Sequence, residues 1–336
     1  MTRVSRLLSA PWRRSGPDAI SDTGAPPGPA PRLSVVVVVY DMPDQAERTL
    51  RSLAPDYQRG VRAEDYEVIV VENRGPRVLG PERALRHGGR VRHLLREEPR
   101  ATPVPAAGAG IALARAPHVA LMIDGARMLT PGILRWTLAA FGADPGAIVS
   151  APGYHLGARP QQQSVNEGHD EAEDARLLGG IGWPSDGYRL FEIGVWSGSC
   201  ARGFFGAHGE SNYLAAPAGI WDRIGGLDPR YDDLGGGKAN HDLYKRMIER
   251  SGAELYLLHG EGSFHQVHGG ITTNTPAERR REVMRAVKEQ DARIRGADTA
   301  PPDAAPVLLG PLHPAVMPFV ARSLEAQREA ARDRAG

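Results

Sequence analysis

The sequence contains a single cysteine, Cys200, among its 336 residues. One thiol can form no internal disulfide and cannot build a zinc site from cysteines. No nucleophile signature surrounds Cys200, so a catalytic thiol is not favoured. A chain of this size without disulfide bonds is typical of a reducing compartment, and we expect a cytoplasmic protein.

A charge excess of either sign and a long apolar run are missing as well. Lysine and arginine number 41 and aspartate and glutamate 40, which gives no electrostatic reason to expect nucleic acid or an anionic membrane as partner. The most apolar stretch, residues 33–40, is far shorter than the roughly 20 residues needed to span a bilayer. We therefore expect no transmembrane segment and no binding of nucleic acid.

The first 31 residues lack the pattern of a folded segment. Residues 24–31 contain four prolines and two glycines, which is typical of a linker. The arginines near the start are followed by no apolar core of a secretory signal. A short amphipathic segment around Leu7, Leu8 and Trp12 is the alternative, but the composition favours a disordered tail and linker over residues 1–31.

Strand and helix patterns then alternate as far as residue 150. Residues 33–40 are rich in β-branched side chains, as in a central strand, and Ala46, Leu50 and Leu53 share one face of the following helix. Further strands are predicted at 66–71, 91–95 and 119–123, and further helices at 105–116 and 131–141. This alternation predicts an α/β fold with an open, mostly parallel sheet. The chain has no G-x-G-x-x-G after its first strand and no P-loop, so the usual dinucleotide and triphosphate signatures are missing.

The fourth predicted strand ends in an acidic loop, Asp124-Gly125-Ala126-Arg127. Ligands of open α/β sheets bind outside the carboxyl ends of the strands, which is where Asp124 would lie. This position suits a residue that holds a cation and a phosphate; the alternative is that Asp124 only caps the turn. Thr130 is the expected N-cap of the next helix, with Pro131 at its first position.

In the second half of the chain, residues 153–210 are rich in glycine, polar and aromatic residues. The acidic run at 166–176 predicts a solvated helix face or a loop rather than a metal site. Four aromatic residues that follow are interpreted as core, with a role as platforms for a sugar ring as the alternative: Trp183, Tyr188, Phe191 and Trp196. His265 and His268 are spaced i, i+3 beside two glycines, so their loop can approach a ligand closely; two histidines bonded to backbone would be the plainer interpretation.

Helices are predicted to close the chain. Thr275-Pro276-Ala277-Glu278 forms a capping box that opens a basic helix. A last amphipathic helix covers 315–331 and either packs on the outside or pairs with a second chain, which would make a homo-oligomer.

Several motifs occur in the order found in family-2 glycosyltransferases of GT-A fold, and the chain resembles that family over about 33–275. Residues 34–53, 68–75 and 106–114 resemble its nucleotide-binding segments, and 123–132 stands in the place of its D-x-D loop. Gly225-Gly226-Leu227-Asp228 matches its Gly-Gly-Phe-Asp segment, and 240–246 matches its Glu-Asp-x-Asp-Leu-x-x-Arg helix. The chain also resembles a subgroup with Asn-x-Asp-Leu and Phe-His-Gln-Val-His-Gly-Gly motifs, and the second motif is the most distinctive string in the sequence.

The resemblance implies one GT-A-type domain with a central mostly parallel sheet, flanking helices and a C-terminal helical extension. Residues 32–150 would be the nucleotide-sugar-binding half, 151–275 the acceptor-binding and catalytic half, and 276–336 the C-terminal helices. The activity implied is transfer of a sugar from a nucleotide-diphosphate sugar to a hydroxyl of a glycan or small molecule, assisted by Mn²⁺ or Mg²⁺ and inverting at the anomeric carbon.

The resemblance and the chemistry of the residues together suggest roles for individual residues. Contacts to the nucleotide and its phosphates are expected from Tyr40, Glu72, Asn73, Gly108, Asp124 and Arg127. Asp124, His265 and His268 are the expected metal ligands, with His268 the favoured histidine. Asp242 is the expected general base, with Asn240 orienting a sugar or acceptor hydroxyl; the alternative is that Asp242 only caps its helix. Glu210 is a second candidate, for the base or for a contact to the acceptor.

The chain departs from the family pattern at two places. The loop at Asp124 keeps only the first acid of the D-x-D motif, and Ala239-Asn240 replaces the usual Glu-Asp pair. Asp124 must therefore find metal partners elsewhere, and we expect them in the loop of His265 and His268; Arg127 could instead offset phosphate charge directly. A retaining transferase, a GT-A-like nucleotidyltransferase and a non-catalytic nucleotide- or glycan-binding protein on a decayed GT-A scaffold stay open as alternatives.

Overall fold

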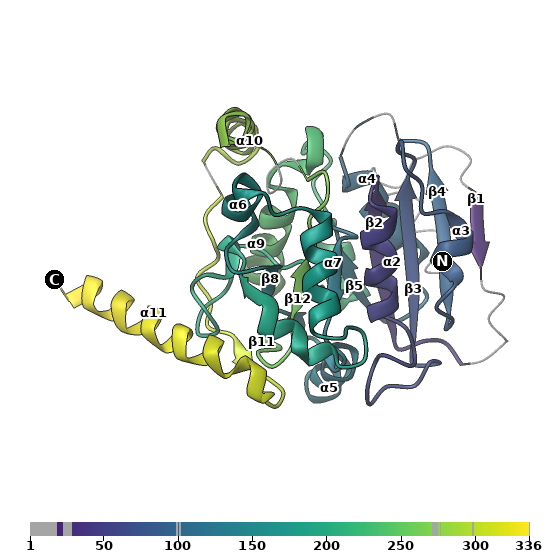
Figure 1. The fold of residues 1–336 in the computed structure, drawn as a ribbon, viewed down its shortest axis with the longest axis horizontal. Coiled ribbons are helices and arrows are strands. Elements are labelled where there is room, and N and C mark those ends of the chain that lie inside the picture. The colour runs from purple at the N-terminus through teal and green to yellow at the C-terminus, as the bar shows by residue number, and fades with distance from the viewer. Residues whose placement is uncertain are drawn as a thin grey trace.

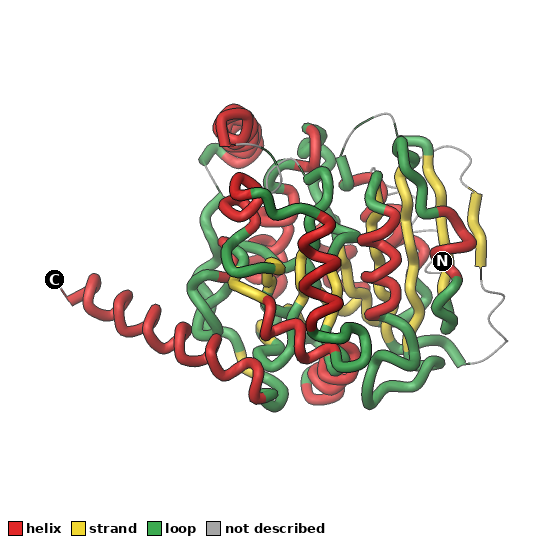
Figure 2. Tube along the Cα trace, in the orientation of Figure 1, coloured by secondary structure: helices red, strands yellow, loops and turns green. Residues whose placement is uncertain are grey.

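The computed structural model describes residues 19–22, 29–98, 100, 102–270, 275, 277–297 and 299–335. They form a large central sheet with helices on both faces and a smaller second sheet beside it (Figures 1 and 2). The predicted α/β class with a mostly parallel central sheet and flanking helices is confirmed.

The central sheet has the strand order β1-β4-β3-β2-β5-β10-β7-β11-β13. Neighbours from β4 to β5 are parallel, β10 runs antiparallel to both β5 and β7, and β11 is parallel to β7 and β13. The strands are β1 (Ala19–Asp22), β2 (Leu33–Tyr40), β3 (Tyr66–Asn73), β4 (Val91–Arg96), β5 (His118–Met122), β7 (Ile148–Ser150), β10 (Leu214–Pro217), β11 (Leu255–Leu257) and β13 (Val307–Leu308).

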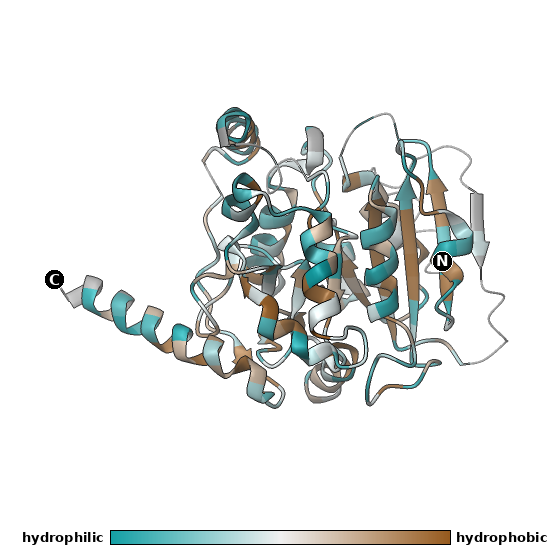
Figure 3. Cartoon of the chain, viewed as in Figure 1, coloured by the Kyte–Doolittle hydropathy of each residue, from teal (hydrophilic) through white to brown (hydrophobic). Residues whose placement is uncertain are grey.

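The middle strands are apolar because both of their faces are covered. Val35 and Val37 of β2 belong to the core on one face of the sheet, and Val36 and Val38 belong to the core on the other. The strands accordingly appear brown along the middle of the hydropathy view (Figure 3). The four strands predicted in this half are present, and β3 runs two residues further than predicted, to Asn73.

Each face of the sheet is packed by its own helices. The first core contains side chains of α2 (Pro43–Ser52), α3 (Gly80–Leu85) and α5 (Ile133–Ala143). The second contains side chains of α4 (Val104–Leu113), α8 (Ala218–Ile224) and α9 (Ala239–Ser251). The predicted apolar face of α2 is buried as expected, since Ala46, Leu50 and Leu53 are all almost inaccessible.

A second sheet of four short strands was not predicted. Its order is β6 (Arg127–Leu129), β12 (Ser263–His265), β8 (Gly153–Leu156) and β9 (Gly194–Trp196). Strands of three or four residues are too short for an alternating pattern to be visible in the sequence. Their pairing brings segments from distant parts of the chain to the carboxyl edge of β5.

Thr130 is not the N-cap of α5, contrary to the prediction. Gly132 occupies the N-cap position and no side chain caps the helix. The hydroxyl of Thr130 instead donates to the carboxylate of Glu261 and accepts the backbone N–H of Gly262 at 3.0 Å. Thr130 therefore connects β6 to the segment that leads into β12, because both segments are buried and each needs partners for its polar groups.

Four residues of the predicted tail form an ordered strand. β1 pairs antiparallel with β4 at the edge of the sheet, with Ala19 opposite Leu95, so backbone pairing outweighs the poor composition of this segment. Residues 1–18 and 23–28, including the candidate amphipathic segment, lie outside the described residues.

The polar region after β8 contains short helices that lie over the second sheet. They are α6 (Gln161–Ser164), η2 (Val165–Glu167), α7 (Glu171–Gly180), η3 (Gly187–Ile193) and η4 (Gly198–Cys200), followed later by η5 (Leu234–Gly236). In the acidic run, Asp170 caps α7 as a solvated residue would, but Asp174 is buried and bonded, contrary to the prediction of a solvated face. Phe191 and Trp196 lie in a third apolar core, as interpreted from the sequence.

The C-terminal part consists of α10 (Ala277–Arg295), η6 (Pro314–Val316) and α11 (Met317–Ala335). Phe319 of α11 packs into the third core and Ser323 is also buried against the body, while the C-terminal part of the helix projects away from it (Figure 1). Pairing of a second chain through this helix stays a prediction. Among the described residues, no helix has the length and apolar character that crossing a membrane requires.

The contact between α4 and the sheet requires a glycine at 110. A Cβ on Gly110 would lie 2.3 Å from Cγ1 of Val36 and 3.0 Å from Cγ2 of Val71. We expect Gly110→Ala to lower the free energy of unfolding by about 1–3 kcal/mol, because overpacking outweighs the helix preference for alanine. Urea unfolding measures the change. Gly142→Ala in α5 is the matched control, since nothing lies within 4 Å of its Cβ position, and stabilisation of both variants alike would contradict the close contact.

Candidate active site

The carboxyl ends of the parallel strands meet at one edge of the central sheet. Tyr40 ends β2 and lies opposite Asn73 at the end of β3, while Asp124 follows β5. Because β10 is antiparallel to β5, with Leu214 opposite Leu121, the residues before β10 also lie at this edge. Glu210 therefore reaches the same edge as Asp124 although it comes from the other half of the chain.

Asp124 occupies a sharp bend after β5. Its Oδ1 accepts the N–H of Ala126 at 3.0 Å, so the residue does cap the turn. The bend lies against β2 so closely that a Cβ on Gly125 would come within 2.7 Å of the carbonyl oxygen of Val38. This turn directs the remaining carboxylate oxygen away from the sheet, toward the second sheet.

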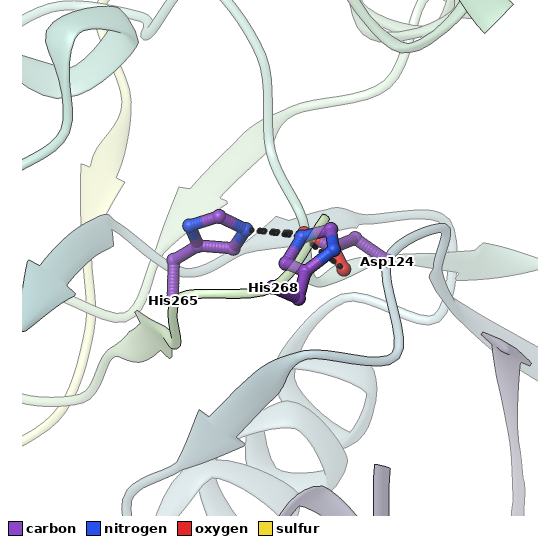
Figure 4. A group of neighbouring side chains, drawn as sticks. All are labelled: Asp124, His265 and His268. Carbon is purple, nitrogen blue, oxygen red and sulfur yellow. Dashed lines mark hydrogen bonds and ion pairs between the residues drawn. The ribbon is translucent and has the colours of Figure 1, made fainter. Parts of the chain in front are cut away.

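Two histidines from the loop at the end of β12 meet that carboxylate (Figure 4). Nε2 of His265 lies 2.9 Å from Oδ2 of Asp124, and Nε2 of His268 lies 3.7 Å from Oδ1. The two Nε2 atoms are 3.0 Å apart. One ligand atom from each of the three residues lies within 4.8 Å of the others. The histidine loop therefore lies beside Asp124, as expected from the sequence.

The protonation of these groups suits a cation. Burial lowers the pKa of His268 to about 4, and burial together with the Arg127 guanidinium lowers the pKa of His265, so both imidazoles are neutral at pH 7. Burial alone would raise the pKa of Asp124, but the neighbouring imidazoles and Arg127 hold it well below its usual range. Two nitrogen lone pairs and a carboxylate are a donor set that accepts Mn²⁺ or another divalent transition metal.

Arg127 lies directly opposite His265 in the second sheet. Its side chain is buried, and its Nε lies 3.3 Å from Oδ2 of Asp124. Its Nη1 is buried without a hydrogen-bond partner, so one strong donor is left over at the site. The predicted contact of Arg127 with a phosphate stays a prediction.

A second polar group surrounds Glu210. Its Oε2 accepts Nδ2 of Asn240 at 2.9 Å, its Oε1 accepts the hydroxyl of Ser199 at 3.2 Å, and Nδ1 of His241 lies 3.5 Å from Oε2. Burial raises the pKa of Glu210, but His241, Arg127 and these hydrogen bonds outweigh it, so the net pKa is lowered. Glu210 is therefore an ionised, half-buried carboxylate with an amide from α9 holding it in place.

Asp242 does not have the surroundings of a general base. It is buried, and its Oδ2 accepts Nε of Arg246 at 2.7 Å and Nη2 of Arg295 at 2.9 Å, while Nε of Arg295 binds Oδ1. Arg295 also pairs with Asp228 at 2.7 Å. Two arginines that stay charged occupy both oxygens, so neither oxygen is available to accept a proton from a substrate. The expected role as general base is therefore corrected: Asp242 joins α9 to α10.

Glu72 and Gly108 were expected to contact the nucleotide, but both are buried. Glu72 is inaccessible, and its carboxylate accepts the backbone N–H of Gly80 at 3.0 Å and contacts Nε2 of His93 at 2.8 Å. Gly108 is buried within α4. Tyr40 is 45% exposed and Oδ1 of Asn73 has no hydrogen-bond partner, so these two stay predictions for the nucleotide.

Several residues around the site were missed. Asp41 has a φ of 53°, and its carboxylate accepts the N–H and Nε of Arg77, both at 3.1 Å, beside Tyr40. Gln161 contacts the ring of His265, and Asp174 accepts the backbone N–H of Val267 at 2.6 Å. The position after the first strand was a signal for Asp41, whereas nothing in the sequence places Gln161 or Asp174 beside the histidine loop.

No protein-family model matches the sequence, and none of the curated proteins is similar to it. Solved glycosyltransferase structures resemble it at low identity. S. aureus TarS 1-349 gives a TM-score of 0.48 at 14% identity over 90% of this chain and 73% of that one. Glucosyl-3-phosphoglycerate synthase from Mycobacterium tuberculosis with Mn²⁺, UDP and glucosyl-3-phosphoglycerate gives 0.47 at 16% over 80% and 81%. The mannosyltransferase PcManGT from Pyrobaculum calidifontis with GDP-Man and Mn²⁺ gives 0.46 at 16% over 99% and 81%. Scores this low support no statement about activity.

Glu261, just before β12, predicts a pH dependence of stability. It is buried against Thr130, the N–H of Gly132 and the hydroxyl of Tyr188, and burial raises its pKa from 4.5 to about 7. The folded protein therefore holds a proton that the unfolded chain has released, so stability falls as pH rises from about 4.5 through 7. The total loss is on the order of 3 kcal/mol.

Urea unfolding at pH 5.5 and pH 8 of the wild type and of Glu261→Gln tests this. The variant keeps the size and an acceptor of Glu261 but cannot ionise. We expect the wild type to lose more stability than the variant between the two pH values. Equal losses in both proteins would show that Glu261 does not titrate in this range.

Proposed function

We propose that the protein is a metal-assisted glycosyltransferase of GT-A type, which moves a sugar from a nucleotide-diphosphate sugar to a hydroxyl acceptor. The observation that carries this proposal is the convergence of the Asp124 carboxylate with Nε2 of His265 and His268 at the carboxyl edge of β5. A diphosphate leaving group needs positive charge where its bond to the sugar breaks. The order of family-2 motifs along the chain supports the same class.

The donor set favours Mn²⁺ over Mg²⁺. Magnesium prefers an octahedron of oxygen ligands, whereas imidazole nitrogen suits transition metals. When bound, the metal would offset the negative charge of the departing diphosphate. Tyr40 and Asn73, at the ends of the neighbouring strands, are the residues we expect to contact the nucleotide, and Nη1 of Arg127 is the spare donor we expect to reach a phosphate oxygen.

We propose Glu210 as the general base of an inverting transfer. It is ionised, half-buried and free of arginine ion pairs, and Asn240 holds it from the helix position where the family usually carries its acid. Deprotonation of the acceptor hydroxyl would place the proton on Glu210 as the hydroxyl oxygen attacks the anomeric carbon. Asn240 is then a residue that orients Glu210.

The metal and donor assignment is tested by thermal shift with UDP-, GDP- and dTDP-sugars. Binding to the folded state raises the melting temperature, so we expect an upward shift with one donor plus Mn²⁺ that disappears with EDTA. Asp124→Asn and His268→Ala should each weaken Mn²⁺ binding at least about tenfold. No shift with any nucleotide sugar, with or without metal, would overturn the proposal.

The base assignment is tested by comparing Glu210→Gln with Asp242→Asn. We expect Glu210→Gln to lower kcat by about 10²–10⁴-fold with little change in donor KM or melting temperature. Asp242→Asn should instead lower the free energy of unfolding, by about 3–5 kcal/mol, because it removes the carboxylate that the buried Arg246 and the half-buried Arg295 share.

Product analysis by NMR separates the mechanisms: an inverted anomeric configuration is expected. A retained configuration, or undiminished turnover in Glu210→Gln, would show that Glu210 is not the base.

A further inference from the structure

We propose that Gln161 is a positioning residue that fixes the tautomer of His265 and so keeps the Nε2 lone pair of that ring directed at the metal site. This inference rests on the proposed metal-assisted function and extends it to a residue outside the ligand set. Gln161 is the first residue of α6 and is fully buried. Its role follows from which of its amide atoms faces which atom of His265.

Both ends of the Gln161 amide contact the same histidine. Nε2 of Gln161 donates to the backbone carbonyl of His265 at 3.1 Å. Oε1 of Gln161 is in hydrogen-bond contact with Nδ1 of the His265 ring. The reverse orientation of the amide would set its oxygen against the backbone carbonyl, which is also an acceptor, so the carbonyl determines which way the amide points.

The orientation of the amide then determines where the ring carries its hydrogen. An amide oxygen can only accept, so Nδ1 must donate. An imidazole that binds a metal is neutral and has one N–H, so a hydrogen held on Nδ1 leaves the Nε2 lone pair for the metal. Nε2 lies 2.9 Å from Oδ2 of Asp124 and 3.0 Å from Nε2 of His268, at the proposed metal site.

Without the acceptor on Gln161, the opposite tautomer becomes favourable. His265 would carry its hydrogen on Nε2 and donate it to the Asp124 carboxylate, which occupies two metal-ligand atoms in one internal hydrogen bond. A cation would then have to displace that bond before binding. Loss of a hydrogen-bond partner of a metal-ligating histidine typically weakens metal binding by about 10–100-fold.

Other buried residues hold the same loop without touching the ring. Nε2 of Gln45 in α2 donates to the carbonyl of Val267 at 2.8 Å, and Gln45 is as inaccessible as Gln161. Gln45→Leu therefore removes a comparable buried amide bond from the histidine loop and leaves the contact with Nδ1 of His265 intact. It is the matched control for Gln161→Leu.

The test is a calorimetric titration of EDTA-treated full-length protein with Mn²⁺ alone, on the wild type and three variants, with melting temperatures to compare folding. We expect Gln161→Leu to bind Mn²⁺ about 10–100-fold more weakly. Gln161→Glu keeps an acceptor for Nδ1 and loses only the donor to the carbonyl, so its affinity should stay close to that of the wild type. Gln45→Leu should also stay close to the wild type.

A spectroscopic readout on the wild type covers the case in which Gln161→Leu fails to fold. In metal-free protein with ¹⁵N-labelled histidine, His265 should show a protonated Nδ1. A bare Nδ1, unchanged Mn²⁺ affinity in Gln161→Leu, or equal weakening in Gln161→Leu and Gln161→Glu would each overturn the inference. Failure of the wild type to bind Mn²⁺ would overturn the metal-assisted function as well, and is recognisable because it needs no variant.

Discussion

The arrangement at the carboxyl edge of the central sheet depends on one electrostatic constraint. Three groups with lone pairs approach one another closely at a largely buried position. The Asp124 carboxylate and Nε2 of His265 and His268 meet where water can offer little compensation, so positive charge must be supplied. Arg127 supplies part of it from β6, directly opposite His265. The register of the short second sheet is what places the Arg127 guanidinium beside the His265 imidazole.

The departures from the family motifs are balanced by residues from elsewhere in the chain. The missing second acid near Asp124 is matched by the imidazoles of His265, at the end of β12, and of His268, in the loop that follows. The acid missing at position 240 is matched by Glu210, which reaches Asn240 because β10 runs antiparallel and starts at the active edge. A scaffold losing its activity has no reason to keep both compensations, which argues for catalysis over a decayed binding module.

The sequence predicted what local patterns encode and missed what depends on long-range contacts. The strands of the parallel half were readable because each is a long apolar run, and the meeting of Asp124 with His265 and His268 was readable from motif order. The strands of the second sheet have only three or four residues, which is too short for an alternating hydrophobic pattern to predict them. The role of Asp242 was misjudged because one of its two arginines, Arg295, arrives from a helix beyond the recognised motifs.

Arg127 acts on both carboxylates of the site. The imidazoles of His265 and His268 and the Arg127 charge lower the pKa of Asp124, and His241 and Arg127 lower the pKa of Glu210. Both carboxylates therefore remain ionised despite burial, as the proposed ligand and the proposed base need to be. A carboxylate at position 127 would instead repel both, so an arginine beside a single retained acid is consistent with a site that takes its remaining metal ligands from histidines.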